Sequence, residues 1–193
     1  VRLYNMLDWL HPSQVCYCDT DSVIFIYDET NPEHKSPEKH KPDNFEFGGG
    51  LGQWEDEFGG KDYIEELVIG GAKSYSYKTK YGCTKKGKVQ VKQKGITLDM
   101  ANDEVVNFDT MREMVLNTAE KGPIDKKKDK EFDPERQIQT KERFQFKWDT
   151  QSKDIITTHI SRSIRSTINE KRTIDGLDSL PFGWLANTRC TIT

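Results

Sequence analysis

The stretch that most constrains this chain is residues 17–25, Tyr-Cys-Asp-Thr-Asp-Ser-Val-Ile-Phe. Asp19 and Asp21 lie two positions apart, and a short run of apolar or aromatic residues stands on each side of them. Runs of this length, bounded by polar residues, are typical of strands. Asp, Thr and Ser suit a tight turn because their side chains bond to nearby backbone groups. The stretch therefore predicts a hairpin with buried arms and two carboxylates at its tip.

Carboxylates beside buried strands need a cationic partner, because burial alone raises their pKa and neutralises them. Mg²⁺ is one such partner, since it prefers oxygen ligands and binds through one or two carboxylates together with substrate phosphates. Two such ions can clamp the attacking and leaving oxygens of a phosphoryl transfer. An ordinary Asp-x-Asp turn without any metal explains the local pattern equally well.

Residues 17–25 resemble the C motif in the palm domain of family-B DNA polymerases. In that family the second aspartate binds the catalytic metals and the first supports the turn. The resemblance implies that Asp21 is the catalytic, metal-binding residue and that Asp19 is a supporting catalytic residue. It also implies two Mg²⁺ ions, held jointly with residues that this chain lacks. Residues 51–57 are similar to a Leu-Gly-x-x-x-x-Glu segment of the protein-primed members, and Lys73-Ser74-Tyr75 is similar to their Lys-x-Tyr motif, which holds the primer terminus.

Residues 67–98, here called the lysine segment, contain eight lysines, no arginine and no acidic residue, although the whole chain has a net charge of −3. Such a segment favours a polyanionic partner over a merely solvated face. Lysine without arginine suits neutralisation of a phosphate backbone rather than reading of bases. We expect Lys73 and Tyr75 to act together, because positions i and i+2 of an extended strand face the same way. The predicted DNA-binding residues are Lys73, Tyr75, Lys78, Lys80, Lys92 and Lys94.

The rest of the chain gives coarser expectations. Apolar residues at positions 3, 6, 7 and 10 predict the last turns of a helix before the hairpin. A helix is expected around residues 103–116, capped by Asn102 or Asp103, with a possible second start at Asp109. Residues 121–136 are dense in charge and indicate a mobile connector. Alternation of Phe144, Phe146 and Trp148 opens a stretch that is rich in strand-forming residues.

These patterns predict an α+β fold: a partial polymerase palm, made of a helix and a β-hairpin, followed by a thumb rich in β-ribbons. Four segments are expected. They are a partial palm at 1–66, the Lys-x-Tyr ribbon and thumb at 67–120, a charged connector at 121–136 and a β-rich segment at 137–193. The last segment, through Lys171-Arg172 and residues 180–184, resembles the tail of polymerases from transposons of the Maverick (Polinton) type.

The resemblance implies template-directed DNA synthesis from dNTPs, on a DNA primer-template or on a terminal protein that serves as primer. The chain lacks the Asp-x-x-Ser-Leu-Tyr-Pro motif, which supplies the second metal-binding aspartate, and the Lys-x-x-x-Asn-Ser-x-Tyr-Gly motif, which grips the nucleotide. We therefore expect a C-terminal fragment that is inactive by itself. The alternative is a non-catalytic nucleic-acid-binding remnant of a decayed transposon polymerase.

The cysteines do not form a recognisable framework. Cys16, Cys18, Cys83 and Cys190 include no Cys-x₂-Cys pair, and no histidine stands at a metal-ligand spacing from them. We expect free thiols in a reducing, intracellular compartment. No apolar run approaches the ~20 residues of a membrane-spanning helix, so no membrane partner is expected.

Overall fold

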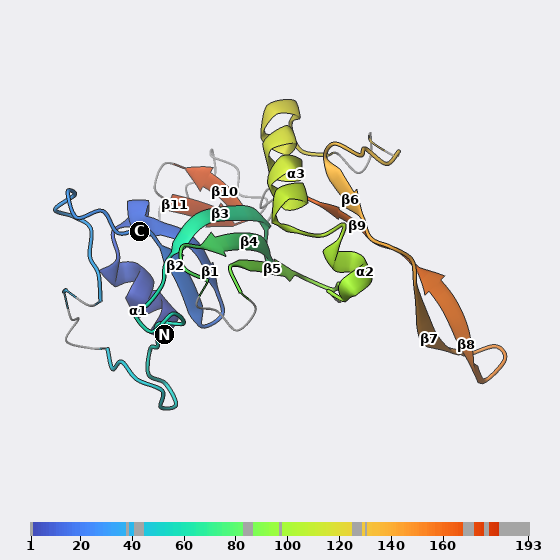
Figure 1. The fold of residues 1–193 in the computed structure, drawn as a ribbon, viewed down its shortest axis with the longest axis horizontal. Helices are drawn as coiled ribbons and strands as arrows, with labels where there is room; N and C mark the ends of the chain where they lie inside the picture. The colour runs from blue at the N-terminus through green and yellow to red at the C-terminus, as the bar shows by residue number, and fades with distance from the viewer. Residues whose placement is uncertain are drawn as a thin grey trace, which may run out of the picture. The chain divides into compact units, whose positions relative to one another are not determined.

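The fold is taken from a computed structural model, shown in Figure 1. It describes residues 2–37, 39–40, 45–82, 87–96, 98–124, 129, 131–167, 172–175 and 178–181, the last two stretches as backbone only. The chain divides into two compact units, one formed by residues 1–65 and 78–88, the other by residues 66–77 and 89–193. These units are defined by packing, whereas the four expected segments are defined by composition and motif. The boundaries of the segments therefore stay a prediction.

The first unit begins with the expected helix, α1 (Arg2–Trp9), on which Met6 is buried. A short 3-10 helix, Pro12–Gln14, follows and leads into the hairpin of β1 (Val15–Asp19) and β2 (Ser22–Phe25). The two strands are antiparallel, with Asp19 opposite Ser22. The predicted hairpin is thus confirmed, although its arms are mostly half-buried rather than buried.

A three-stranded sheet has the order β3 (Ile64–Gly71), β4 (Ser74–Thr79) and β5 (Val89–Gln93). Along β4, serine and threonine occupy buried positions, and their hydroxyls bond within the sheet: Ser76 Oγ donates to the Gln90 carbonyl at 2.9 Å. Small side chains here allow close packing, since a Cβ on Gly70 would lie 3.5 Å from the Met114 Cε atom. The adjoining Gly71 has φ +141°, and a Cβ there would lie 2.3 Å from Thr167 Oγ1. An alanine at Gly71 is therefore both strained and sterically blocked.

The core of the second unit is built around α3 (Phe108–Lys121), the helix drawn in yellow-green in Figure 1. Its buried residues Phe108, Met111 and Met114 pack with residues from β3, from the segment just before α3 and from two later strands, namely Val68, Val106, Ile138 and Ile164. The helix is capped by Asn107, whose side chain accepts from the Thr110 N–H, rather than opening at Asp109 as expected. A separate short helix, α2 (Met100–Asp103), is capped by Asp99, so the expected cap at Asn102 or Asp103 is wrong.

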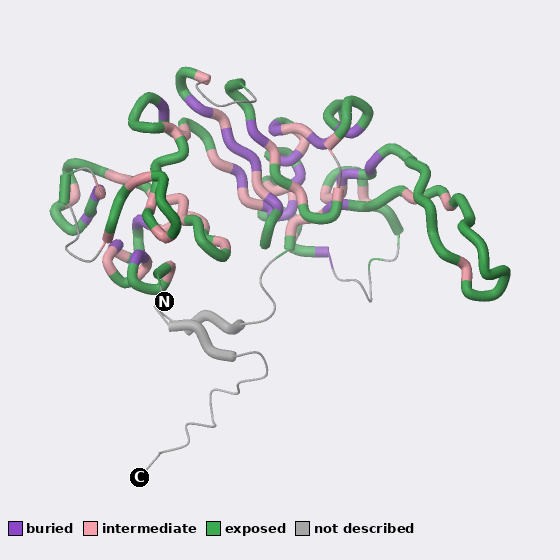
Figure 2. Tube along the Cα trace, turned by 90° about the horizontal axis from the view of Figure 1, so that it is seen from below, coloured by how far each residue is buried: buried purple, intermediate pink, exposed green. Residues whose placement is uncertain are grey.

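Three antiparallel strand pairs make up most of the described residues of the C-terminal part. They are β6 (Gln137–Gln139) with β9 (Ser163–Arg165), β7 (Arg143–Asp149) with β8 (Asp154–Ile160), and β10 (Arg172–Asp175) with β11 (Asp178–Pro181). The β-rich character expected for this region holds for its described residues. Figure 2 shows that the β7–β8 ribbon is exposed along nearly its whole length.

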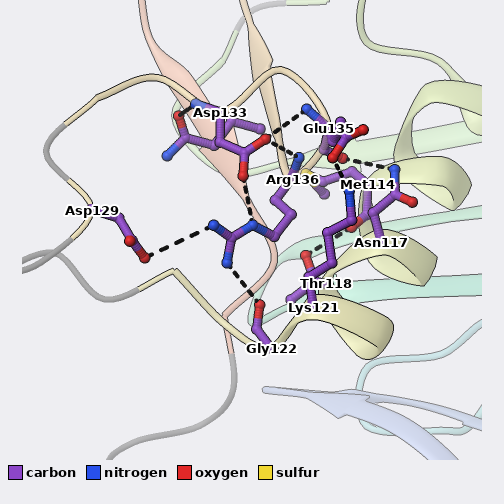
Figure 3. A network of polar contacts seen from close by, with 10 residues as sticks. Met114, Asn117, Thr118, Lys121, Gly122, Asp129, Asp133, Glu135 and Arg136 are labelled. Carbon is purple, nitrogen blue, oxygen red and sulfur yellow. Dashed lines mark hydrogen bonds and ion pairs between the residues drawn. The ribbon is translucent and has the colours of Figure 1, made fainter.

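The described part of the expected connector is held by a polar network, which Figure 3 shows from close by. Arg136 Nε donates to Asp133 Oδ2 at 2.6 Å, and Arg136 Nη1 donates to the Gly122 carbonyl at 3.2 Å, just beyond the end of α3. Lys121, in the last turn of α3, pairs with Glu135. Within residues 131–136 a guanidinium with two acceptors thus ties the chain to the end of the helix, and the expected mobility of the connector stays a prediction.

The chain is therefore an α+β protein with several small sheets and few helices. None of the helices in the described part of the chain combines the length and the apolar character that a membrane span requires. Cys16 and Cys18 are free thiols, and burial raises the pKa of the Cys16 thiol. Cys83, Cys190 and the side chains of the Maverick-like tail lie outside the described residues.

Candidate metal site and nucleic-acid interface

Asp19 and Asp21 lie at the tip of the β1–β2 hairpin but in different environments. Thr20 and Asp21 form the two-residue turn, with Thr20 at φ 50°. The Asp19 side chain is half-buried and accepts from Thr20 Oγ1 at 2.9 Å, while its carbonyl accepts from Ser22 Oγ at 3.1 Å. The Asp21 side chain is exposed. The tip thus presents one accessible carboxylate, beside a second whose oxygen is already hydrogen-bonded.

This arrangement fits part of a magnesium site. Mg²⁺ keeps several waters and takes one or two carboxylates together with phosphate oxygens, so the exposed Asp21 suits one of its ligands. The described residues contain no group of three or more His, Cys, Asp or Glu side chains placed to hold a metal ion. The hairpin by itself can therefore offer one such ligand, Asp21, with Asp19 fixing the turn that presents it.

The Lys-x-Tyr motif does not lie in one extended strand, so that expectation is wrong. Ala72 and Lys73 form the turn between β3 and β4, and Lys73 has φ 56°, a left-handed conformation. Tyr75 lies within β4 and stacks on Tyr77, with ring centroids 6.4 Å apart and planes at 12°. The rule that places positions i and i+2 on one face applies within a strand, and Lys73 lies before β4 begins. Lys73 is exposed at a turn, whereas Tyr75 is half-buried in a sheet.

Two of the predicted DNA-binding lysines come together at this turn. The Lys94 N–H donates to the Lys73 carbonyl at 2.8 Å, so the end of β5 lies beside the β3–β4 turn. Both side chains are exposed, as is that of Lys92 on β5. This end of the sheet therefore gathers three of the six predicted contacts, all cationic and all accessible to a phosphate backbone.

The remaining predicted lysines, Lys78 and Lys80, belong to the first unit, as the hairpin does. Lys78 is half-buried at the end of β4. Lys80 Nζ forms an ion pair of 2.7 Å with Glu65 Oε1. The hydrogen bond to Glu65 raises the pKa of Lys80, and the same bond lowers the pKa of Glu65. The ion pair makes Lys80 less available to a phosphate than its place in the lysine segment suggested. Its partner, Glu65, lies just before that segment in the sequence.

One exposed feature was not assigned a function from the sequence. Phe144, Phe146 and Trp148 were expected to alternate in a strand, and they do so on β7, but all three are exposed. Alternation indicates a strand with two unlike faces and does not say whether the apolar face is covered. The sequence signal that could have indicated their exposure was the density of charged residues around these rings.

Comparison with family models, with curated proteins and with solved structures found no match to this chain.

Proposed function

We propose that this chain carries the C-motif hairpin and part of the thumb of a protein-primed family-B DNA polymerase, and that it contributes one metal-binding aspartate and a lysine-rich DNA contact surface to nucleotidyl transfer from dNTPs. The observation that carries the proposal is the tip of the β1–β2 hairpin. There Asp21 stands exposed in a two-residue turn that Thr20 and Ser22 brace through Asp19.

Each residue has a role that follows from its surroundings. Asp21 offers carboxylate oxygens to a divalent ion, and such ions stabilise the charge that develops on the attacking and leaving oxygens. Asp19 holds the turn. Lys73, Lys92 and Lys94 neutralise phosphates of the primer-template, and Tyr75 supports the sheet beneath the Lys73 turn. The second metal-binding aspartate and the dNTP-binding groups belong to other parts of such an enzyme, and a terminal protein that serves as primer is a separate partner.

A second candidate is non-catalytic binding of nucleic acid by a remnant of such a polymerase. The lysine segment favours it, because these cations attract a polyanion whether or not the hairpin binds a metal. The two candidates differ at Asp21, which only the first requires.

The test uses Mn²⁺, which substitutes for Mg²⁺ at oxygen sites and broadens nearby NMR signals. In ¹⁵N-labelled protein with DNA present, we expect Mn²⁺ to broaden the amide signals of residues 20–22 before others. Asp21→Asn should abolish this selectivity. Asp19→Asn should weaken it less, since the Asp19 carboxylate is engaged by Thr20.

Glu55→Gln serves as the control, since it removes one exposed carboxylate that belongs to the same unit but not to the hairpin. It should leave the broadening at residues 20–22 unchanged. DNA binding without selective broadening at the tip favours the non-catalytic candidate. Broadening that persists in Asp21→Asn contradicts the assignment of Asp21 as a metal ligand.

A further inference from the structure

A small depression in the second unit is lined by hydrogen-bond donors. Gly95, Asn102, Thr140, Arg143 and Arg162 line it together with two isoleucines, and its volume is about 10 Å³. That volume admits one water-sized atom, such as an oxygen of a phosphate group. Among the described residues that line it, none is acidic. The depression therefore has the size and the charge of a site for one oxygen of an anion.

Arg162 is held at this depression by its backbone. Its N–H donates to Thr140 Oγ1 at 2.8 Å, and its carbonyl accepts from the Thr140 N–H at 2.9 Å. Its Nη1 atom lies over Gly95, where a Cβ would be only 2.7 Å away. Gly95 has φ +73°, so both the backbone and the guanidinium favour glycine at this position. The guanidinium is thus placed at the residue that follows Lys94.

The donors of the depression are not used up within the described part of the protein. Arg162 forms no ion pair with a described residue, and neither does Lys94. Thr140 is buried, and its hydroxyl accepts from Arg162 but donates to no described residue. Asn102 Oδ1, an acceptor on the lining, already accepts from the Lys141 N–H at 3.1 Å. Gathered donors without acceptors favour an anionic ligand.

The acidic residues near the lining do not cancel this charge. Four of them are neighbours of lining residues in the sequence, namely Asp99, Asp103, Glu104 and Glu142. None of the four lines the depression. Glu104 pairs with Lys141, Glu142 Oε2 lies 3.4 Å from His159 Nδ1, and the Asp99 side chain caps α2. The depression itself therefore stays cationic.

The depression adjoins two lysines of the proposed DNA contact surface. Lys94 directly precedes Gly95, and its N–H bond to the Lys73 carbonyl brings the β3–β4 turn to the same place. Consecutive Cα atoms are about 3.8 Å apart, so a guanidinium that lies over Gly95 is within a few ångströms of the Lys94 backbone. A DNA strand that contacts these lysines can therefore present a phosphate to Arg162.

We propose that Arg162 clamps one backbone phosphate of bound DNA, together with Arg143 and the Thr140 hydroxyl. This phosphate belongs to the strand that Lys73 and Lys94 contact, so the choice of partner rests on the proposed function. A guanidinium suits the task because its planar fork bonds two phosphate oxygens at once, which an ammonium cannot do. The clamp adds an arginine to a surface whose own segment of sequence contains none.

The experiment is a fluorescence anisotropy titration of a labelled 20-base-pair duplex at several salt concentrations. Arg162→Gln should weaken binding by about 10-fold, because it removes hydrogen bonds to a charged group. It should also flatten the slope of log K against log salt by about one unit, since one phosphate is no longer neutralised. Arg112→Gln removes the same charge from an exposed position of α3 and should leave both values as they are.

Two further variants keep the net charge and test the geometry. Arg162→Lys should retain the wild-type slope but lose about 3- to 5-fold in affinity, because the fork is gone. Gly95→Ala should weaken binding by about threefold or more, since its Cβ displaces the guanidinium. Gly122→Ala is the matched control: it has φ +85° and an equally strained backbone, but nothing lies within 4 Å of the added Cβ. Circular dichroism checks that each variant folds.

Three results overturn the inference. The first is an Arg162→Gln variant that binds DNA as Arg112→Gln does. The second is full wild-type affinity in Arg162→Lys, because a point charge then suffices. The third is displacement of DNA by millimolar inorganic phosphate at constant ionic strength, in wild type but not in Arg162→Gln, which assigns the depression to a free anion.

The same titration separates this inference from the proposed function. If replacing Lys73 and Lys94 by Ala flattens the salt slope while Arg162→Gln does not, the clamp fails and the proposed function stands. If the lysine replacements leave the slope unchanged, the proposed DNA contact surface fails, and the clamp fails with it.

Discussion

Gln14 is the residue that holds the start of the hairpin to the loop that follows it. Its side chain is fully buried and makes four hydrogen bonds. Nε2 donates to the carbonyls of Ile26 and Lys35, at 2.9 and 2.8 Å, and Oε1 accepts from the N–H groups of Lys35 and His11, at 2.8 and 3.2 Å. A buried amide with all these groups satisfied fixes local geometry, because each bond broken leaves a backbone group unpaired.

Gln14→Ala is therefore expected to open this loop. With net values near 1 kcal/mol for each hydrogen bond, the loss is about 2–4 kcal/mol of local stability. Amide hydrogen exchange measures it directly, since the Lys35 N–H should lose protection by a factor of about 30 to 1,000. Gln151→Ala, at an exposed glutamine, is the control. Unchanged protection of the Lys35 N–H would show that Gln14 does not hold the loop.

Residue roles were only partly predictable from the sequence. The hairpin tip was predictable because Asp, Thr and Ser between two apolar runs have few alternatives to a turn. Gln14 was not, because a glutamine after His-Pro-Ser has the composition of a surface turn. Its burial depends on partners at Ile26 and Lys35, 12 and 21 residues further along the chain. Only the folded chain brings such partners together.

At the scale of elements, Arg136 joins the end of α3 to the strands that follow. Arg136→Lys keeps the charge but loses the planar fork that bonds Asp133 and Gly122 together. Loss of the bond to the Gly122 carbonyl should lower the free energy of unfolding by about 1–2 kcal/mol, measured by urea denaturation. Arg112→Lys, at an exposed position of α3, should have little effect. Equal stability of the two variants would contradict a structural role for Arg136.

The same network predicts a dependence on pH. The hydrogen bond from Arg136 lowers the pKa of Asp133 below its ordinary value of 3.8. The folded protein therefore binds this proton less readily than the unfolded chain, so the contribution is fully present above about pH 4 and is lost as the pH falls through the lowered pKa. Wild type should lose stability as the pH falls below about 4, and the Asp133→Asn variant should lose less over the same range. An identical pH profile in both proteins would contradict the linkage.

The β3–β4–β5 sheet gives a prediction about Lys80. Because Glu65 holds this lysine, Glu65→Gln should release it to a phosphate and make the slope of log K for DNA against log salt steeper by about one unit. Glu120→Gln changes the net charge equally at an exposed position of α3 and should leave the slope as it is. If both variants give the wild-type slope, Lys80 does not reach the DNA.

Elements were predicted better than their ends. Periodicity located α1, the hairpin and the strand at Phe144–Trp148, since a repeating apolar pattern reports which face is unlike the other. The pattern placed Lys73 in a strand, although it lies in the β3–β4 turn. That turn depends on the φ of +141° at Gly71 and on the hydrogen bond from the Lys94 N–H to the Lys73 carbonyl. The pattern also missed the cap at Asn107. Each error concerns one or two residues at which the local sequence is compatible with several backbone conformations.

At the scale of the whole molecule, charge is unevenly distributed along the chain. Residues 1–60 contain 12 acidic and 4 basic residues, whereas the lysine segment contains no acidic residue. The net charge of −3 therefore does not oppose binding of DNA, because contacts within about 10 Å dominate at physiological salt. In the proposed function, a few lysines rather than the overall charge therefore carry DNA binding.

The most direct test of the central claim is the salt dependence of duplex DNA binding, measured by fluorescence anisotropy. If Lys73, Lys92 and Lys94 contact phosphates, log K should fall against log salt with a slope of about −3 and depend little on base sequence. Replacing Lys73 and Lys94 by Ala should flatten the slope by about two units, whereas replacing Lys127 and Lys128 should not. A slope near zero, or one that the Lys73 and Lys94 replacements leave unchanged, would contradict the account.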